Sequence, residues 1–262
     1  MFPFRNILFP TDLSVNAQAA LKYANAFAQH GHGLVVSLSV QDAKEIAQAA
    51  IDQDIDLITV EMRDRNLLTR AFGSSLAEDV IAESPCAVLA VRPPQRDFVD
   101  GSSEIQLKRV LLATNFRPSS VAATQLATQM SNQLGAELHA VYVIGDYFEQ
   151  ISVMFPEGGL AALTRLRSYV QERMANLSRG GGETHITEGR PYQEIVKLAD
   201  TLEADLIVIG TAVHGSLFGS SHVLGSEIER VIRNAPCPVL CVPAARAMTP
   251  LPALVTQIVP QT

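Results

Sequence analysis

A glycine-rich segment between residues 210 and 226 has the composition of a phosphate-binding loop. Its glycines allow the backbone to approach a ligand closely and to adopt positive φ. Gly225 and Ser226 stand at the expected start of a helix, where free backbone N–H groups and the helix dipole favour an anion. Because glycines also serve ordinary turns, the segment alone indicates a phosphate site only weakly.

Polar residues also end the first expected strand in each half of the chain. Asp12 follows one of these strands, and Asn115 follows the other after Thr114. In an open parallel sheet, ligands bind beyond the carboxyl ends of the strands, so an acceptor here could take an adenine amino group or a hydroxyl. The alternative is that Asp12 and Asn115 cap the following helix or form an Asx turn.

The two halves resemble each other because the chain contains two copies of one domain. Residues 78–91 and 229–242 are identical at eight of 14 aligned positions. Thr11 aligns with Thr114 at an offset of 103, whereas Glu45 aligns with Glu194 at an offset of 149. Self-similarity at a long period indicates a duplication, and the 46-residue difference indicates that the first copy lacks about one β-α unit.

The second copy alternates apolar runs with helical patterns, which predicts βαβ units and a parallel sheet. The fold class is therefore α/β, with two open parallel-sheet domains of 3-2-1-4-5-like order in tandem. We expect five strands in the second copy. The first copy should keep four, since an edge strand and its helix can be lost while the other strands retain their neighbours.

The expected domains are residues 1–94 and 107–243, with a polar linker at 95–106 and a proline-containing tail at 244–262. The last strands of the copies, Ala87 to Val91 and Val239 to Val242, are apolar. An exposed apolar strand edge invites pairing, so these strands should pair across a pseudo-twofold axis. The apolar part of the tail should pack on the protein or on a second chain, which leaves a homodimer open.

Composition excludes several classes of function. The net charge is −7 and no run of Lys or Arg occurs, which argues against binding to nucleic acid or to an anionic membrane. No apolar stretch reaches roughly 18 residues and no basic leader precedes the first strand, so we expect a cytoplasmic protein. No nucleophile–base pair, Walker A sequence or paired-carboxylate site is evident, so an enzyme is the less favoured class and no catalytic residue is assigned.

The cysteines and histidines do not suggest a redox or metal site. Cys86 and Cys237 each begin an apolar strand, where a small buried hydrophobic residue is expected, and no C-x-x-C sequence occurs. His30 and His32 form the single H-x-H sequence, but no further ligand is nearby. We therefore expect no metal.

The chain resembles a tandem universal stress protein over nearly all of residues 1–243. Residues 7–14 (ILFPTDLS) resemble the opening strand of that family, and residues 235–240 (APCPVL) resemble its closing strand. ATP-binding members carry the loop G-x2-G-x9-G-[ST]. In this chain Gly215, nine further residues and Gly225-Ser226 match the second half of that loop, whereas four residues separate Gly210 from Gly215.

The resemblance implies a stress-response regulatory protein that binds an adenine nucleotide, ATP, in its second copy. The base would lie near the ends of the first two strands of that copy, and the phosphates would lie on the glycine-rich loop. The implied binding residues are Thr114, Asn115, Val143, Gly210, Thr211, His214, Gly215, Gly225 and Ser226.

Two departures from the family pattern weaken this prediction. Asn115 replaces the usual Asp, and Glu227 places a carboxylate where it competes with phosphate for the helix dipole. The first copy keeps Asp12 but retains only Gly73-Ser74 of the loop. The alternatives are a nucleotide-free interaction scaffold with degenerate pockets and, less favoured, a slow ATPase.

Overall fold

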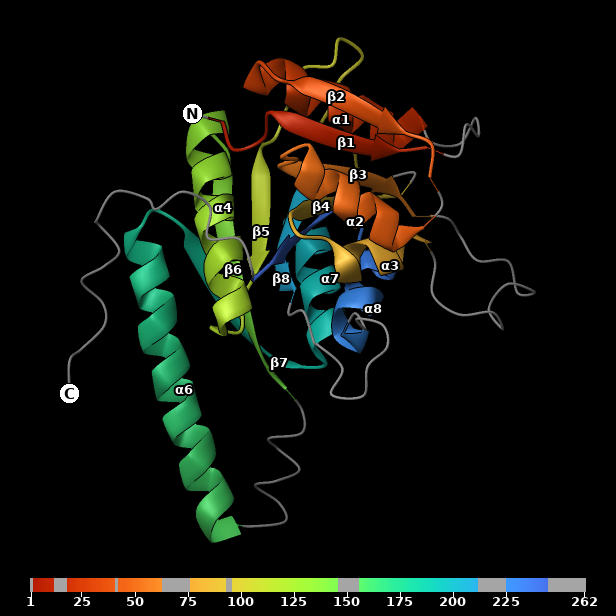
Figure 1. The fold of residues 1–262 in the computed structure, drawn as a ribbon. Coiled ribbons are helices and arrows are strands. Elements are labelled where there is room, and N and C mark those ends of the chain that lie inside the picture. Colours follow the sequence, from red (N-terminus) through yellow and green to blue (C-terminus); the bar gives the residue numbers. More distant parts are fainter. Residues whose placement is uncertain are drawn as a thin grey trace, which may run out of the picture.

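The described part of the chain forms one continuous α/β sheet with helices on both faces. The computed structural model describes residues 2–11, 18–40, 42–62, 76–92, 96–145, 156–211 and 225–244. Nine strands within these ranges pair in the order β2-β1-β3-β4-β9-β8-β5-β6-β7 (Figure 1). The first four belong to the N-terminal half of the chain and the other five to the C-terminal half.

The N-terminal half has four parallel strands among its described residues, as the alignment offset predicted. The apolar runs form the strands, and the segments with helical periodicity form the helices between them. The elements are β1 (Asn6–Pro10), α1 (Gln18–Gly31), β2 (Leu34–Leu38), α2 (Ala43–Asp52), β3 (Leu57–Glu61), α3 (Leu76–Glu83) and β4 (Ala87–Val91).

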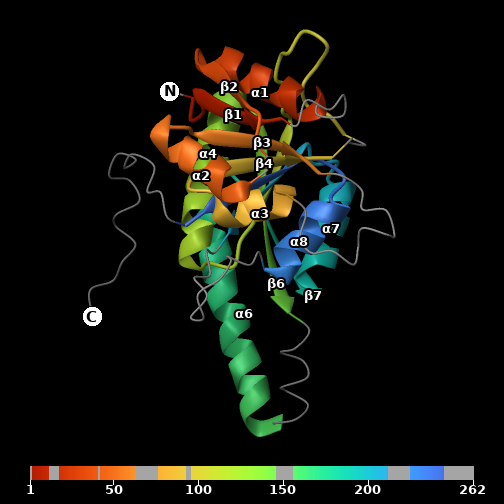
Figure 2. The same ribbon diagram turned by 45° about the vertical axis from the view of Figure 1, so that its right-hand side comes forward.

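The C-terminal half has the complete set of five parallel strands, in the predicted 3-2-1-4-5 order. Its extra unit is α6 with the edge strand β7, and the first part of α6 projects beyond the other elements (Figures 1 and 2). The elements are β5 (Arg109–Ala113), α4 (Pro118–Leu134), β6 (Glu137–Gly145), α6 (Pro156–Arg179), β7 (Glu183–Gly189), α7 (Pro191–Thr201), β8 (Leu206–Thr211), α8 (Ser226–Asn234) and β9 (Val239–Pro243).

The two halves join through the strands that the sequence predicted. β4 runs antiparallel to β9, with Leu89 opposite Leu240 at the centre of the pairing. One buried core lies between the sheet and helices α1, α4 and α6, and the other lies against α2, α3, α7 and α8. Both cores contain residues from both halves, so the halves share their hydrophobic interior.

An ion cluster reinforces this joint. Arg233 of α8 pairs with the buried Glu78 of α3 and, at 3.0 Å, with Glu229 of its own helix. Glu78 and Glu229 are equivalent positions of the two copies in the sequence alignment. Arg92, directly after β4, donates to the backbone oxygens of Arg233 and Ala235. Charged side chains of both halves therefore lie across the pseudo-twofold joint.

The segment before β5, whose polar composition predicts a linker, contacts both halves. Arg96 pairs with Asp200 of α7 at 2.7 Å, and the ring of Phe98, which is buried, lies 4.8 Å from the ring of Tyr23 in α1. Asp97 accepts hydrogen bonds from Lys22 Nζ at 2.6 Å and from the Tyr23 hydroxyl at 2.8 Å. These contacts connect α1 to the C-terminal half of the molecule.

The three cysteines are buried and form no disulfide, and burial of Cys86 and Cys237 was predicted from their positions at strand starts. Burial raises the pKa of the Cys237 and Cys241 thiols to about 12, so both are neutral at physiological pH. Among the described helices, none has the length and apolar character that a membrane crossing requires. The tail beyond residue 244 lies outside the described residues, as does its expected packing.

Candidate functional site

A pocket of about 260 Å³ opens at the carboxyl ends of β5, β6 and β8 in the C-terminal half. The strand register creates it, because Ala113 at the end of β5 lies beside Val141 of β6 and Ile209 of β8. Four of the nine residues assigned from the sequence line this pocket, although they are spread over nearly 100 positions of the chain. They are Thr114, Asn115, Val143 and Gly210.

Asn115 has part of its hydrogen-bonding capacity committed to the local backbone. Its Oδ1 accepts from the Arg117 N–H at 3.1 Å, which is an Asx turn, and from the Ser120 hydroxyl at 2.7 Å. These bonds occupy both lone pairs of the amide oxygen. Within the described residues Nδ2 has no recorded partner, so the group that Asn115 offers to a ligand is a donor.

The turn after Asn115 is held in an uncommon conformation. Phe116 has a φ of 57°, in the left-handed region that a bulky residue rarely adopts. Its N–H donates to Thr114 Oγ1 at 3.3 Å, and its ring stacks on Tyr142 with centroids 5.3 Å apart. The aromatic stacking and the Asx turn together fix the backbone beside the pocket.

Gly210 has a packing role that the sequence did not reveal. A Cβ on this residue would lie 2.3 Å from the Ser119 oxygen and 2.9 Å from the Ser120 nitrogen, in the first turn of α4. These are backbone atoms that cannot rotate away. Gly210 therefore allows α4 to lie against the end of β8, whatever the pocket binds.

Gly225, by contrast, has room for a side chain among the described residues. It is the N-cap of α8, and the described atom nearest to a Cβ there is Ile228 Cδ1, at 3.9 Å. Ser226 is the first residue of the helix, and none of the described side chains caps its start with a hydrogen bond. The start of α8 therefore has the accessible backbone that anion binding requires.

Of the remaining assigned residues, one lies away from the described pocket lining and two lie outside the described residues. Thr211 is buried at the end of β8, next to Pro243 in the register, and it is not among the residues that line the pocket. His214 and Gly215 belong to residues 212–224, which lie outside the described residues. Asp12, Gly73 and Ser74 of the first copy also lie outside them.

Glu227 adds a negative charge to the pocket lining. Its Oε2 accepts a hydrogen bond from the Tyr192 N–H at 3.0 Å, and its Oε1 lies 3.3 Å from Arg230 Nη1. The carboxylate thus sits between the first turns of α7 and α8, where backbone N–H groups stabilise it. A phosphate approaching α8 would encounter this charge.

The remaining lining is mainly apolar and includes Ile195, Ile209, Ile228 and Val231. Apolar walls with a few fixed polar groups suit a planar organic ring. Neither His nor Lys occurs among these described lining residues. The apolar lining lies between the Thr114–Asn115 turn on one side and the start of α8 on the other.

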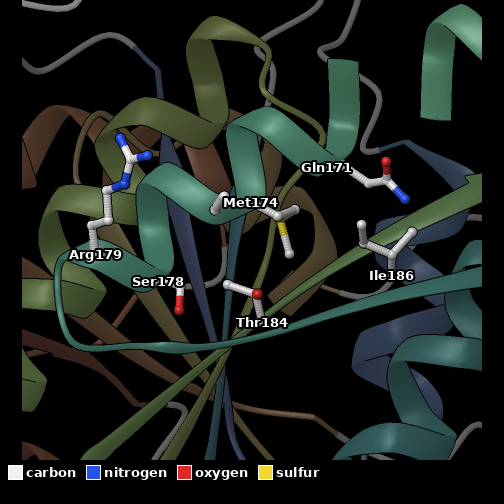
Figure 3. A pocket seen from close by; sticks show the side chains of 7 residues that line it. Gln171, Met174, Ser178, Arg179, Thr184 and Ile186 are labelled. Atoms are coloured by element: carbon white, nitrogen blue, oxygen red, sulfur yellow. The ribbon is translucent and has the colours of Figure 1, made fainter. Parts of the chain in front are cut away.

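A second hollow, of about 610 Å³, lies on the other face of the sheet, between the C-terminal half of α6 and β7. Met174 and Ile186 face it together with the polar side chains of Gln171 and Thr184 (Figure 3). Among the described residues that line it, Arg179 alone is charged. Few polar groups converge here, so the first pocket is the stronger candidate for a ligand.

Comparison with known proteins gives a consistent result. The model of the universal stress protein family matches residues 35–92 and 106–243. A universal stress protein of Methanocaldococcus jannaschii is 33% identical over 145 residues, which cover 52% of this chain and 81% of that protein. One from Thermus aquaticus is 33% identical over 138 residues, which cover 52% of this chain and 98% of that protein.

A solved structure extends the likeness to both halves. The universal stress protein of Archaeoglobus fulgidus is 20% identical, with a TM-score of 0.64 over 92% of this chain and 97% of that chain. At that identity the comparison establishes the fold. The tandem arrangement is thus shared over nearly the whole length of both chains.

Proposed function

The chain belongs to the universal stress protein family, and from this premise we propose that it binds an adenine nucleotide, ATP, in the pocket of its C-terminal half. Binding would serve a regulatory role in the stress response rather than a catalytic one. The supporting observation is the convergence of Thr114, Asn115, Val143 and Gly210 on one pocket. These are four of the residues that the family resemblance implies for ATP.

The geometry suggests an orientation for the nucleotide. The base would lie against the apolar lining near Val143, where the Asn115 amide can donate to a ring nitrogen. The phosphates would lie at the start of α8, where Gly225 leaves the backbone accessible. His214 and Gly215 would complete the phosphate loop.

One observation favours a second candidate function, a nucleotide-free interaction scaffold. The Glu227 carboxylate lines the pocket and already accepts the Tyr192 N–H, so a negative group occupies part of the region proposed for phosphate. The neighbouring Arg230 pairs with Glu227 and partly offsets its charge. The scaffold function requires that this residual repulsion prevent nucleotide binding altogether.

Calorimetric titration with ATP and with GTP separates the two functions. We expect the natural protein to bind ATP in preference to GTP. Asn115→Asp should retain the Asx turn, because one carboxylate oxygen can still accept from Arg117 and Ser120. Its second oxygen becomes free to accept the adenine amino group in a charge-assisted hydrogen bond, whereas the neutral hydrogen bond from Nδ2 to the ring nitrogen is lost. Because a hydrogen bond to a charged group contributes about 1 kcal/mol more than a neutral one, ATP binding should tighten by up to about tenfold.

A melting-temperature measurement provides the control for this variant, since an intact Asx turn should leave the melting temperature close to that of the natural protein. Mass spectrometry of any ligand released on denaturation tests the identity of the nucleotide directly. Absence of ATP binding by both the natural protein and Asn115→Asp would support the scaffold function instead.

A further inference from the structure

A cluster of histidine and glutamate side chains lies at the amino ends of β6 and β7, at the opposite end of these strands from the pocket. His139 of β6 stands beside Glu183 in the register of the two strands, and His185 lies two residues further along β7. All three side chains are on one face of the sheet, and the potential ligand atoms lie within 4.8 Å of one another. The universal stress protein resemblance assigns no role to them.

The distances within this cluster suit a bound metal ion. His139 Nδ1 and His185 Nε2 are 3.3 Å apart. Two imidazole nitrogens bound to one tetrahedral Zn²⁺ at the usual bond length would stand about 3.3–3.4 Å apart. Glu183 contributes Oε2 at 3.5 Å from His139 Nδ1 and Oε1 at 3.9 Å from His185 Nε2. A central ion can therefore contact both nitrogens and the carboxylate after small side-chain rotations.

Burial and the second nitrogen of His139 provide independent support. The His139 side chain is 8% exposed, and its buried Nε2 has no hydrogen-bond partner among the described residues. Glu137 Oε2 lies 3.7 Å from this nitrogen and is held by Arg109 Nε at 3.3 Å. In many metal sites a ligating histidine directs its other ring N–H toward a carboxylate, which is the relation of His139 to Glu137.

The site is also accessible to an ion. The side chain of Glu183 is 67% exposed and that of His185 is 20% exposed, so solvent reaches the cluster from the edge of the sheet. Two imidazoles with one carboxylate form a donor set typical of zinc and neighbouring transition metals. Mg²⁺ and Ca²⁺ prefer oxygen ligands throughout and are disfavoured.

We propose that His139, His185 and Glu183 bind a divalent first-row transition-metal ion of the Zn²⁺ class, with water completing the coordination. His139 ligates through Nδ1, His185 ligates through Nε2, and Glu137 orients His139 from the other side. The ion links the edge strand β7 to β6 and thereby stabilises the outer edge of the sheet. The competing explanation is a hydrogen bond between two neutral imidazoles with no metal.

Zinc titration of chelator-treated, full-length protein tests the proposal. We expect one Zn²⁺ to bind per chain, to raise the melting temperature and, when replaced by Co²⁺, to give the visible absorption of a tetrahedral site. Glu137→Gln removes a partner of a ligand and should weaken Zn²⁺ binding by roughly 10–100-fold. His185→Gln removes a ligand itself and should weaken Zn²⁺ binding by more than that. Glu183→Gln alters an exposed side chain and should weaken binding without affecting the fold.

The double variant His30→Gln with His32→Gln is a matched control, because it removes two imidazoles from the other half of the molecule. It should bind Zn²⁺ as the natural protein does. The proposal is overturned if the natural protein binds no Zn²⁺, if His185→Gln and Glu183→Gln bind it unchanged, or if only the control loses it. ATP titrations of the same variants should be unaltered, so failure of the metal site is distinguishable from failure of the nucleotide site.

Discussion

At the scale of single residues, Glu227 has two opposing effects on the pocket. It satisfies the Tyr192 N–H at the start of α7, and it places a negative charge beside the start of α8. The first effect stabilises the protein, and the second opposes phosphate. Since the Glu227 side chain is 42% exposed, solvent screens its repulsion and reduces it without removing it.

Replacement of Glu227 by Val should therefore tighten ATP binding by about 0.3–1 kcal/mol, the usual effect of one charge at a helix end. Calorimetric titration measures the change. Glu229→Gln is the matched control, since it neutralises another carboxylate in the first turn of α8 that does not line the pocket. Equal affinities for the natural protein and Glu227→Val would show that this charge does not limit binding.

Arg233 forms an ion pair across the joint between the two halves. Its partner Glu78 is 4% exposed, and a buried carboxylate without its counter-ion is costly. We expect Arg233→Met to lower the free energy of unfolding by about 3 kcal/mol, measured by urea denaturation. The double variant with Glu78→Gln should recover most of the loss, and a double variant no more stable than Arg233→Met would contradict the ion-pair explanation.

At the scale of elements, residues 96–98 connect α1 to the C-terminal half through side-chain contacts. Burial alone would raise the pKa of Asp97, but hydrogen bonds from Lys22, Val99 and Tyr23 outweigh burial and hold that pKa below its ordinary value. The same arrangement raises the pKa of Tyr23, through burial and through the hydrogen bond to Asp97. The charged form of Asp97 and the neutral form of Tyr23 are therefore the stable pair.

A depressed pKa in the folded state stabilises the protein above the unfolded pKa, which is about 3.9 for Asp, and the benefit is lost as the pH falls through the folded value. We expect Asp97→Asn to destabilise the protein by about 1 kcal/mol at pH 7, because the site is partly exposed. The difference in unfolding free energy between the natural protein and Asp97→Asn should shrink below about pH 4. Urea denaturation of the natural protein and of Asp97→Asn across this pH range measures the difference. Asp52→Asn, which alters an exposed carboxylate, is the control. A difference in unfolding free energy that does not change with pH would contradict a stabilising role for the Asp97 charge.

The elements were predictable from the sequence because their signals are local or repeated. The alignment offsets of Thr11 and Glu45 predicted that the first copy lacks a strand, and apolar repeats predicted the joint at Leu89 and Leu240. Contacts that depend on strand register or on distant packing were not predictable. The contact between His139 and His185 depends on the β6–β7 register, and the packing role of Gly210 depends on the position of α4. The Asx turn was one of two alternatives for Asn115, which the sequence left open.

At the scale of the whole molecule, the two copies share one sheet and two continuous cores. β4 and β9 form the antiparallel pair at the centre of the sheet, and residues of both halves contribute to each core. Separating the halves would expose these strand edges and divide both cores. The fused copies therefore form one structural unit within the described residues.

Thermal unfolding should accordingly show a single transition, despite the two family repeats. The calorimetric and van't Hoff enthalpies should agree, and circular dichroism should report the same midpoint. Two resolved transitions, or midpoints that differ between the methods, would mean that the halves unfold independently. The comparison is best made without nucleotide or added metal, because a ligand bound to one half changes the apparent stability.

The central claim, that the C-terminal pocket binds ATP, is tested most directly by calorimetric titration of two matched glycine variants. Gly225→Val places a branched side chain at the start of α8, where the nearest described atom to a Cβ is 3.9 Å away, so the fold should tolerate it while phosphate approach is blocked. Gly73→Val changes the equivalent glycine of the first copy. We predict that the natural protein and Gly73→Val bind ATP alike and that Gly225→Val does not bind; ATP binding retained by Gly225→Val, or absent from the natural protein, would contradict the claim.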